Sequence, residues 1–370
     1  MGAEPVDQEP ERSDCEPVMA AHSSQCESRE RERATSLPLY PVIISLLHSR
    51  FSFCNMPSQL HTIAEDTVAE RRLNFVIRSG EWSDIGERPH MEDTSVCIGD
   101  LAREFGCEFN GSEAVSFYGV FDGHGGASAA EFVRDNLPRV IVKDVDFPAS
   151  MEQAVSRSFI GTDAALGESS LGRSSCSGTT AITALVFGKS LLVANVGDCR
   201  AVLSRRGLAV EMSTDHKTCC EEERIRVEAR GGHVIDGYLN GHLSVTRALG
   251  DWHLEGMKDG PLSGEPEMKL VTLTEEDEFL IIGSDGVWDV FSNQNAVDFS
   301  RRKLQDHNDV KQCSREIVQE AIRRGSTDNL TAVVVTFRAE PPPQCALPRP
   351  RFRRSISAEG LQNLRTFLEM

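Results

Sequence analysis

The chain has 370 residues, of which 39% are hydrophobic and 26% charged, as in an ordinary soluble globular protein. This length could bury one large core or two medium ones. The formal net charge of −18 would repel a polyanionic backbone, which argues against nucleic acid as the main ligand. An excess of acid suits a soluble surface or a carboxylate cluster that holds cations.

The sequence also bears on the compartment. Its 11 cysteines form no C-x-x-C pair, so neither a zinc ribbon nor a thioredoxin-like motif is indicated. The acidic N-terminus is unlike a secretory or organelle leader. The apolar run at 37–47 contains two prolines and is shorter than the roughly 20 residues that cross a bilayer. We therefore expect reduced thiols, no membrane association, and a place in the cytoplasm, the nucleus or both.

Three regions differ in composition. Residues 1–72 lack sustained periodicity and predict a mostly disordered extension. Residues 73–340 carry the periodic patterns of a folded domain. Residues 341–370 begin with three prolines and continue as an arginine-rich tail that could end in a short amphipathic helix. Within this tail, Ser355 and Ser357 fit either a site for a basophilic kinase or an unmodified basic segment.

Inside the folded region, apolar periodicity predicts alternating helices and strands. Short apolar runs predict strands at 73–77, 94–98, 115–121, 181–187, 191–196, 201–203, 279–282 and 330–337. Apolar residues at helical spacing predict helices at 127–142, 151–166 and 314–324, and the charged stretch at 221–230 predicts an exposed helix that ends at Gly231-Gly232. Glycine-containing turns separate the middle strands, which is typical of antiparallel hairpins. Residues 213–266 are more polar and irregular.

Aspartates recur where predicted buried strands end. Asp122, Asp198 and Asp285 each follow such a strand, and Asp328 comes just before the last one. If they meet at one rim of a sheet pair, several ionised carboxylates need a cation. All-oxygen ligands select Mg²⁺ or Mn²⁺ over Zn²⁺. Two such ions about 3.5–4 Å apart can lower the pKa of a shared water, which then attacks a phosphoester in line.

The motifs occur in a characteristic order. They are Glu92-Asp93, Asp122-Gly123-His124-Gly125-Gly126, Ser177-Gly178-Thr179-Thr180-Ala181, Gly197-Asp198, Arg247-Ala248-Leu249-Gly250-Asp251, Asp285-Gly286-Val287-Trp288-Asp289 and Asp328-Asn329. Over about residues 75–338 this order resembles the metal-dependent protein serine/threonine phosphatases of type 2C, and most of all their plant members. The resemblance implies an α+β fold, a β-sandwich of two antiparallel sheets flanked by helices, with two Mg²⁺ or Mn²⁺ ions at one end.

The resemblance also implies roles for single residues. It assigns metal binding to Asp122 (bridging both ions), Gly123 (through its carbonyl), Asp285, Asp328, Glu92 (through water) and Asp198 (at a weaker third site). Arg88 would grip the substrate phosphate, for which a guanidinium fork is well shaped. His124 would be the general acid that protonates the departing serine or threonine oxygen. The implied reaction is in-line attack on phosphoserine or phosphothreonine by a hydroxide that bridges the metals.

Partners and departures from the family pattern are less defined. Thr218 stands where the family usually has proline after His216-Lys217, which we expect to loosen that turn. Residues 213–266 correspond to the variable flap of the family, where a regulatory partner could bind. We expect phosphoprotein substrates and a monomer. The alternative is a catalytically weak protein on the same fold that sequesters a kinase or another signalling partner.

A cysteine-phosphatase mechanism is a weaker interpretation. The Cys-x5-Arg spacing occurs at Cys97/Arg103, Cys199/Arg205, Cys220/Arg226 and Cys345/Arg351. A spacing that occurs four times in one chain is weak evidence for a catalytic loop. In addition, no histidine immediately precedes any of these cysteines. In one case three glutamates follow the cysteine and would repel a phosphate.

Overall fold

The computed structural model describes residues 75–107, 114–169, 176–258 and 260–344, which belong to one compact unit spanning 69–370. The predicted extension at 1–72 and the tail with Ser355 and Ser357 lie outside the described residues and stay predictions. Among the described helices, none is both long and apolar enough to span a membrane.

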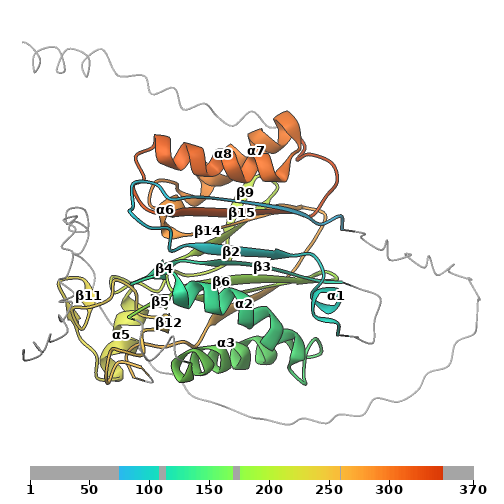
Figure 1. The fold of residues 1–370 in the computed structure, drawn as a ribbon. Coiled ribbons are helices and arrows are strands. Elements are labelled where there is room, and N and C mark those ends of the chain that lie inside the picture. The colour runs from blue at the N-terminus through green and yellow to red at the C-terminus, as the bar shows by residue number, and fades with distance from the viewer. Residues whose placement is uncertain (1–74, 108–113, 170–175, 259, 345–370) are drawn as a thin grey trace, which may run out of the picture. The chain divides into compact units, whose positions relative to one another are not determined.

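Two antiparallel sheets form the centre of the domain (Figure 1). The first has the order β1-β15-β14-β8-β9, and the second has the order β13-β7-β6-β3-β2. The strands of the first are β1 (Arg78–Asp84), β8 (Arg200–Arg205), β9 (Leu208–Glu211), β14 (Asp277–Gly283) and β15 (Leu330–Thr336). Those of the second are β2 (Thr94–Ile98), β3 (Val115–Phe121), β6 (Ala181–Phe187), β7 (Ser190–Val196) and β13 (Glu267–Thr272).

Helices cover the outer face of each sheet (Figure 1). The covering helices are α2 (Ser128–Lys143) and α3 (Met151–Glu168) on the second sheet and α7 (Asn293–His307) and α8 (Val310–Arg323) on the first. The short helix α1 (Leu101–Phe105) contributes the buried Leu101 to the same core cluster as α2. A third cluster, which includes Tyr118, Leu280 and Val333, fills the space between the sheets. This arrangement confirms the predicted α+β sandwich.

Shorter elements gather at one end of the sandwich (Figure 1). A small sheet has the order β12-β5-β4, from β4 (Gly123–His124), β5 (Gly178–Thr179) and β12 (Leu249–Gly250). The flap, which we define as residues 213–266, contains α5 (Glu221–Ala229) and a hairpin of β10 (Val234–Ile235) and β11 (Tyr238–Leu239). The four-residue helix α6 (Asp285–Trp288) directly follows β14 and one serine.

Apolar runs located the central strands well, because these strands are covered on both faces. Every residue of β3, β14 and β15 is buried, so the greater part of each strand reads as an apolar run. The predicted strand at 94–98 and the helix at 221–230 also match β2 and α5. Trp288, interpreted as a core residue, is 6% exposed.

The predicted first strand at 73–77 is wrong for residues 75–77, which form no strand, and 73–74 lie outside the described residues. The strand β1 begins at Arg78 and pairs with β15 along its whole length. Its sequence is polar because it is an edge strand, and its one buried residue is Gly80. A Cβ at this position would lie 2.4 Å from the backbone nitrogen of Lys311, so close packing of α8 explains a glycine that reads as a turn.

Helix α8 begins at Val310, four residues before the predicted start, and α7 was not predicted. Both starts carry capping signals in the sequence. The side chains of Ser292 and Asp309 accept hydrogen bonds from the backbone N–H groups of Asn295 and Gln312. These caps, rather than apolar spacing, were the signal that could have placed both helices.

The strand pairing brings the predicted aspartates to one end of the sandwich. Ala181 at the start of β6 pairs with Val196 at the end of β7, and Ile182 pairs with Val120 at the end of β3. In the other sheet, Gly283 at the end of β14 pairs with Ala332 near the start of β15. The segments that follow β3 and β7 therefore leave the second sheet at the same end, and the meeting of Asp285 with Asp122 and Asp198 places the end of β14 there too.

Candidate metal centre and active site

Three carboxylates meet at this end of the sandwich. Asp122 follows β3, Asp198 follows β7 and a glycine, and Asp285 opens α6. One carboxylate oxygen from each lies within 4.8 Å of the others. Asp198 is buried and the other two are half-buried. The predicted convergence is thus present for these three residues.

The electrostatics of this group favour a bound cation. Burial and the negative charges of Asp93, Asp285 and Asp198 raise the pKa of Asp122 well above its ordinary value. Burial and neighbouring aspartates likewise raise the pKa of Asp285. Burial also raises the pKa of Asp198, although the Lys217 ammonium lies 3.3 Å from its Oδ2 and opposes the shift. A hard divalent ion would relieve this repulsion, and the all-oxygen donor set fits Mg²⁺ or Mn²⁺.

The strand end that carries Asp122 is held by β5. The backbone N–H of Thr180 donates to the carbonyl of Asp122 over 2.8 Å, and the Thr179 hydroxyl donates to the same oxygen over 3.1 Å. At the neighbouring Gly123, a Cβ would lie 2.5 Å from the carbonyl oxygen of Glu92. Glycine is therefore required for these two backbone segments to approach each other.

Asp328 and Arg88 face each other at the rim of the site. Nη2 of Arg88 lies 2.7 Å from Oδ2 of Asp328. The next residue, Asn329, accepts from the backbone N–H of Glu92 and donates to the carbonyls of Ile85 and His90. The Asn329 side chain, which sequence reasoning named only as part of a motif, thus ties the loop that carries Arg88 and Glu92 to the start of β15.

His124 lies on β4 and contacts Asp251. Its Nε2 is 2.9 Å from Oδ2 of Asp251, whose side chain is 1% exposed. Burial by itself lowers the pKa of His124, but the charge and hydrogen bond of Asp251 outweigh it and raise the pKa above its ordinary value. The sequence alone indicates no role for Asp251, because no local pattern predicts that its motif contacts the motif of His124.

Asp93 is a second residue for which sequence reasoning gave no specific role. It is 7% exposed, and its Oδ2 accepts from the Ser284 hydroxyl over 2.7 Å. Burial raises its pKa to about 6, despite hydrogen bonds that lower it. The acid pair Glu92-Asp93 was the available signal, and Asp93 is the member whose buried negative charge raises the pKa of Asp122.

The ionised carboxylate of the buried Asp93 is unfavourable for folding. The difference in stability between wild type and the Asp93→Asn variant is therefore expected to depend on pH. A carboxyl with a raised folded pKa stabilises fully below its unfolded pKa, and that contribution is lost as pH rises through the folded pKa. In EDTA, the free energy of unfolding of wild type should therefore fall relative to Asp93→Asn between about pH 4 and about pH 6. The shift corresponds to about 3 kcal/mol. Denaturant titrations at several pH values measure it, and parallel curves for the two proteins would contradict it.

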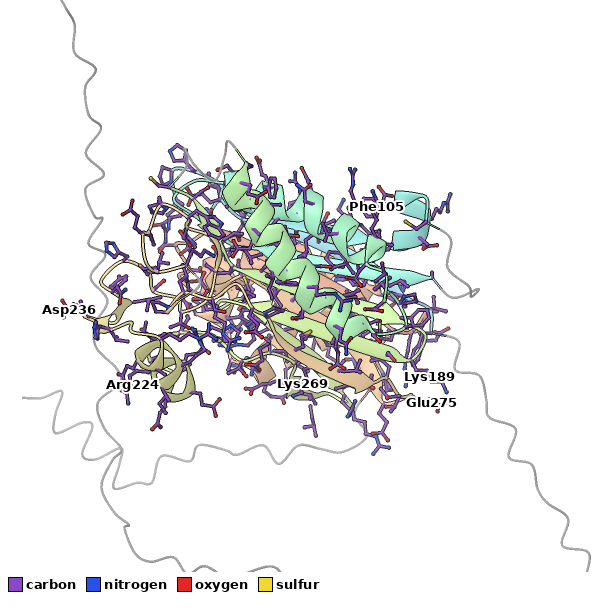
Figure 2. The ribbon with its side chains drawn as sticks, turned by 90° about the horizontal axis from the view of Figure 1, so that it is seen from below. Phe105, Lys189, Arg224, Asp236, Lys269 and Glu275 are labelled. Atoms are coloured by element: carbon purple, nitrogen blue, oxygen red, sulfur yellow. The ribbon has the colours of Figure 1, made fainter. Side chains whose placement is uncertain are left out.

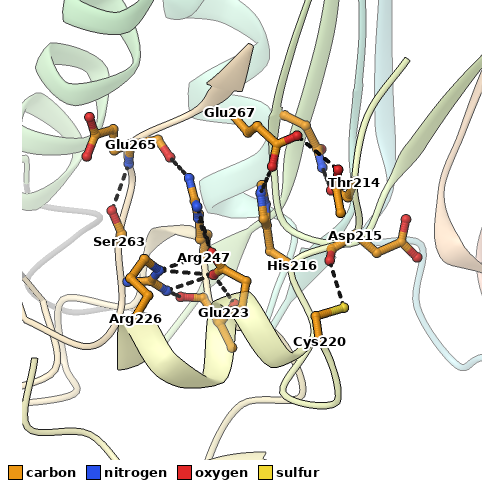
Figure 3. A network of polar contacts seen from close by, with 12 residues as sticks. Thr214, Asp215, His216, Cys220, Glu223, Arg226, Arg247, Ser263, Glu265 and Glu267 are labelled. Carbon is orange, nitrogen blue, oxygen red and sulfur yellow. Dashed lines mark hydrogen bonds and ion pairs between the residues drawn. The ribbon is translucent and has the colours of Figure 1, made fainter. Parts of the chain in front are cut away.

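The flap is held by a network of ion pairs (Figure 3). Glu223 of α5 pairs with Arg247 at 2.6 Å and Arg226 at 2.9 Å. Burial tends to raise the pKa of Glu223, but hydrogen bonds from Arg247, Arg226 and Thr246 hold that pKa well below its usual range. A small core that includes Val227 lies beside this network. The flap is thus a packed unit rather than an irregular loop.

The position of the flap fits a role beside the carboxylates. In Figure 2 its residues Arg224 and Asp236 lie at the opposite end of the sandwich from Lys189 and Glu275. The Thr218 hydroxyl donates to the carbonyl of Gly237 and so connects the start of this segment to the turn of the β10–β11 hairpin. The turn expected to be loose therefore has a specific tie.

Three of the four cysteines of the Cys-x5-Arg patterns lie among the described residues, and these three are poor nucleophiles. Those within the described ranges are free thiols. Burial raises the pKa values of Cys97, Cys199 and Cys220, so each thiol stays protonated at neutral pH. Cys345 lies outside the described residues. These surroundings argue against a thiolate mechanism.

Comparisons with known proteins agree with the fold and the motif order. The family model for Protein phosphatase 2C matches residues 84–330. The chain is 64% identical over 316 residues to "Probable protein phosphatase 2C 54" of Oryza sativa subsp. japonica, covering 83% of this chain and 87% of that one. It is 54% identical over 324 residues to "Probable protein phosphatase 2C 22" of Arabidopsis thaliana, covering 85% and 83%.

A solved structure shares the fold. The crystal structure of a serine-threonine phosphatase 2C from Toxoplasma gondii superposes with a TM-score of 0.60 and 24% identity. The match covers 71% of this chain and 95% of that chain. The family match extends over most of the described domain, and the identities to plant relatives extend over most of the chain. The chain therefore belongs to the protein phosphatase 2C family, and it is a plant-like protein phosphatase.

Proposed function

We propose that the protein hydrolyses phosphoserine and phosphothreonine in proteins, and that it depends on Mg²⁺ or Mn²⁺ bound at the carboxylate cluster. The observation that carries this proposal is the group formed by Asp122, Asp198 and Asp285, with donor oxygens within 4.8 Å of one another. Members of this family depend on these metals in general. Bound there, two such ions would lower the pKa of a water and neutralise phosphate charge.

The remaining residues of the site fit the other needs of this reaction. The metal ligands would be Asp122, the Gly123 carbonyl, Asp285, Asp328, Glu92 through water, and Asp198 at a weaker third site. The Arg88 guanidinium would orient the phosphate, because its fork matches two phosphate oxygens. His124 would hand a proton to the departing serine or threonine oxygen. A binding protein without turnover has no specific observation in its favour.

The test is turnover by the recombinant full chain on a phosphothreonine peptide. With added Mn²⁺ or Mg²⁺ we expect release of inorganic phosphate, and EDTA should abolish it until excess metal is restored. A phosphotyrosine peptide of the same sequence serves as the control for substrate class. Metal-saturated protein that turns over no phosphopeptide would instead support the sequestering protein on this fold, and full activity in EDTA would rule out the metal centre.

A further inference from the structure

Asp251 and His124 are 127 residues apart in sequence, yet their side chains meet at 2.9 Å. We propose that Asp251 is a positioning residue for His124, whose carboxylate fixes the orientation of the imidazole ring toward the substrate. This inference rests on the proposed general-acid role of His124. It assigns Asp251 an effect on the reaction that is exerted only through the His124 imidazole.

The small sheet is built around this contact. Its central strand β5 pairs with β4 on one side and with β12 on the other. His124 of β4 and Gly250 of β12 both lie opposite Gly178. A Cβ at position 178 would lie 2.1 Å from Oδ2 of Asp251 and 2.4 Å from Nε2 of His124. The two side chains therefore meet over a position that only glycine can occupy.

The backbone of Asp251 is held so that its carboxylate points to this place. Its φ is +56°, in the left-handed region that aspartate tolerates better than most residues. Its N–H donates to the carbonyl of Ser177 over 3.0 Å. The preceding Gly250 N–H donates to Oδ1 of Asp163 on α3 over 2.8 Å. These bonds anchor the segment to α3 and to the residue that precedes β5.

The carboxylate is otherwise poorly satisfied. It is nearly fully buried, and within the described ranges its Oδ1 has no hydrogen-bond partner. Burying a carboxylate with so few partners is unfavourable for folding. Because the Asp251 carboxylate contributes little to stability, its effect on the His124 imidazole explains it better. The imidazole is about one-third exposed, so without this contact the ring would be able to turn.

The contact also selects the nitrogen that acts. In the imidazolium both nitrogens carry hydrogens, and Nε2–H donates to Asp251. Nδ1 is then the nitrogen that gives its proton to the serine or threonine oxygen as the P–O bond breaks and water supplies the new oxygen on phosphorus. The ring is left neutral with its remaining hydrogen on Nε2, still bonded to Asp251.

Kinetics with different leaving groups test this assignment. For Asp251→Ala in the full chain we expect kcat on a phosphothreonine peptide to fall about ten- to thirtyfold, with KM little changed. On p-nitrophenyl phosphate, whose leaving group needs no proton, the fall should be less than about threefold. Asp251→Asn should recover part of the loss, because its amide oxygen still accepts from Nε2–H.

Asp277→Asn is the matched control. Asp277 is also buried and pairs with Arg205 at 2.7 Å, but it begins β14, at the end of that strand away from the site. This variant should lose stability and show no dependence on the leaving group. If Asp251→Ala does not fold, as judged by thermal unfolding, the comparison rests on Asp251→Asn, for which an equal loss on both substrates would overturn the inference.

His124→Ala separates failure of this inference from failure of the proposed function. If His124→Ala shows a loss that depends on the leaving group and Asp251→Ala lowers turnover of both substrates equally, the positioning role is wrong and the general acid stands. If His124→Ala also lowers both equally, the general-acid role fails and the inference fails with it. Leaving-group dependence in both variants supports the assignment.

Discussion

Replacing Asp122 with asparagine is expected to lower kcat/KM for a phosphothreonine peptide about a thousandfold, since a metal ion can supply about 4 kcal/mol of transition-state stabilisation. Asp122 lies in the group whose donor oxygens are within 4.8 Å of one another. The asparagine amide has nearly the shape of the aspartate carboxylate but lacks the negative charge that attracts the ion. Calorimetric titration with Mg²⁺ or Mn²⁺ should therefore show a loss of binding that matches the loss of turnover.

The same variant has a second expected result, on stability. Without metal, burial and neighbouring carboxylates make the ionised form of Asp122 unfavourable, as its raised pKa indicates. Asparagine removes this repulsion, so the melting temperature in EDTA should stay equal to that of wild type or rise. Asp144→Asn is the control, because Asp144 pairs with Arg157 at 2.6 Å at the far end of α2. Full activity and unchanged metal affinity in Asp122→Asn would refute the metal centre.

The sequence predicted this site better than it predicted the edges of the fold. Asp122, Asp198 and Asp285 follow strands buried on both faces, and such strands are visible as apolar runs. Their convergence then follows from antiparallel pairing. The edge strand β1 has no such run, because its fit depends on the backbone of α8 at Gly80, a tertiary contact that no local pattern encodes.

The contact between His124 and Asp251 marks the limit of the same reasoning. Both residues were visible within motifs, but their meeting depends on the register of three two-residue strands. Strands this short have no hydrophobic periodicity to read. Asn329 and Asp93 are similar cases, because each acts through a hydrogen bond to a distant segment. The sequence therefore indicates which residue types gather at the site, and the fold decides which of them touch.

Arg88→Ala is expected to weaken the phosphate interaction about a hundredfold, since a charge-assisted bidentate contact is worth about 1.5–3 kcal/mol. In the structure Arg88 is held instead by Asp328, at 2.7 Å. That pair is partly exposed and so contributes at most about 1 kcal/mol. A phosphate dianion can therefore take the guanidinium from Asp328 at small cost, which would also leave the Asp328 carboxylate available to a metal ion.

Two measurements separate this role from a structural one. The KM for the phosphopeptide and the inhibition constant of inorganic phosphate should rise by similar factors in Arg88→Ala, because both ligands present the same oxygens. Arg88→Lys should recover little, since an ammonium cannot contact two oxygens in one plane. Arg157→Ala removes an arginine that pairs with Asp144 and Asp146 away from the site and should leave both constants unchanged. An Arg88→Ala enzyme with wild-type phosphate inhibition would mean that this guanidinium does not contact the phosphate.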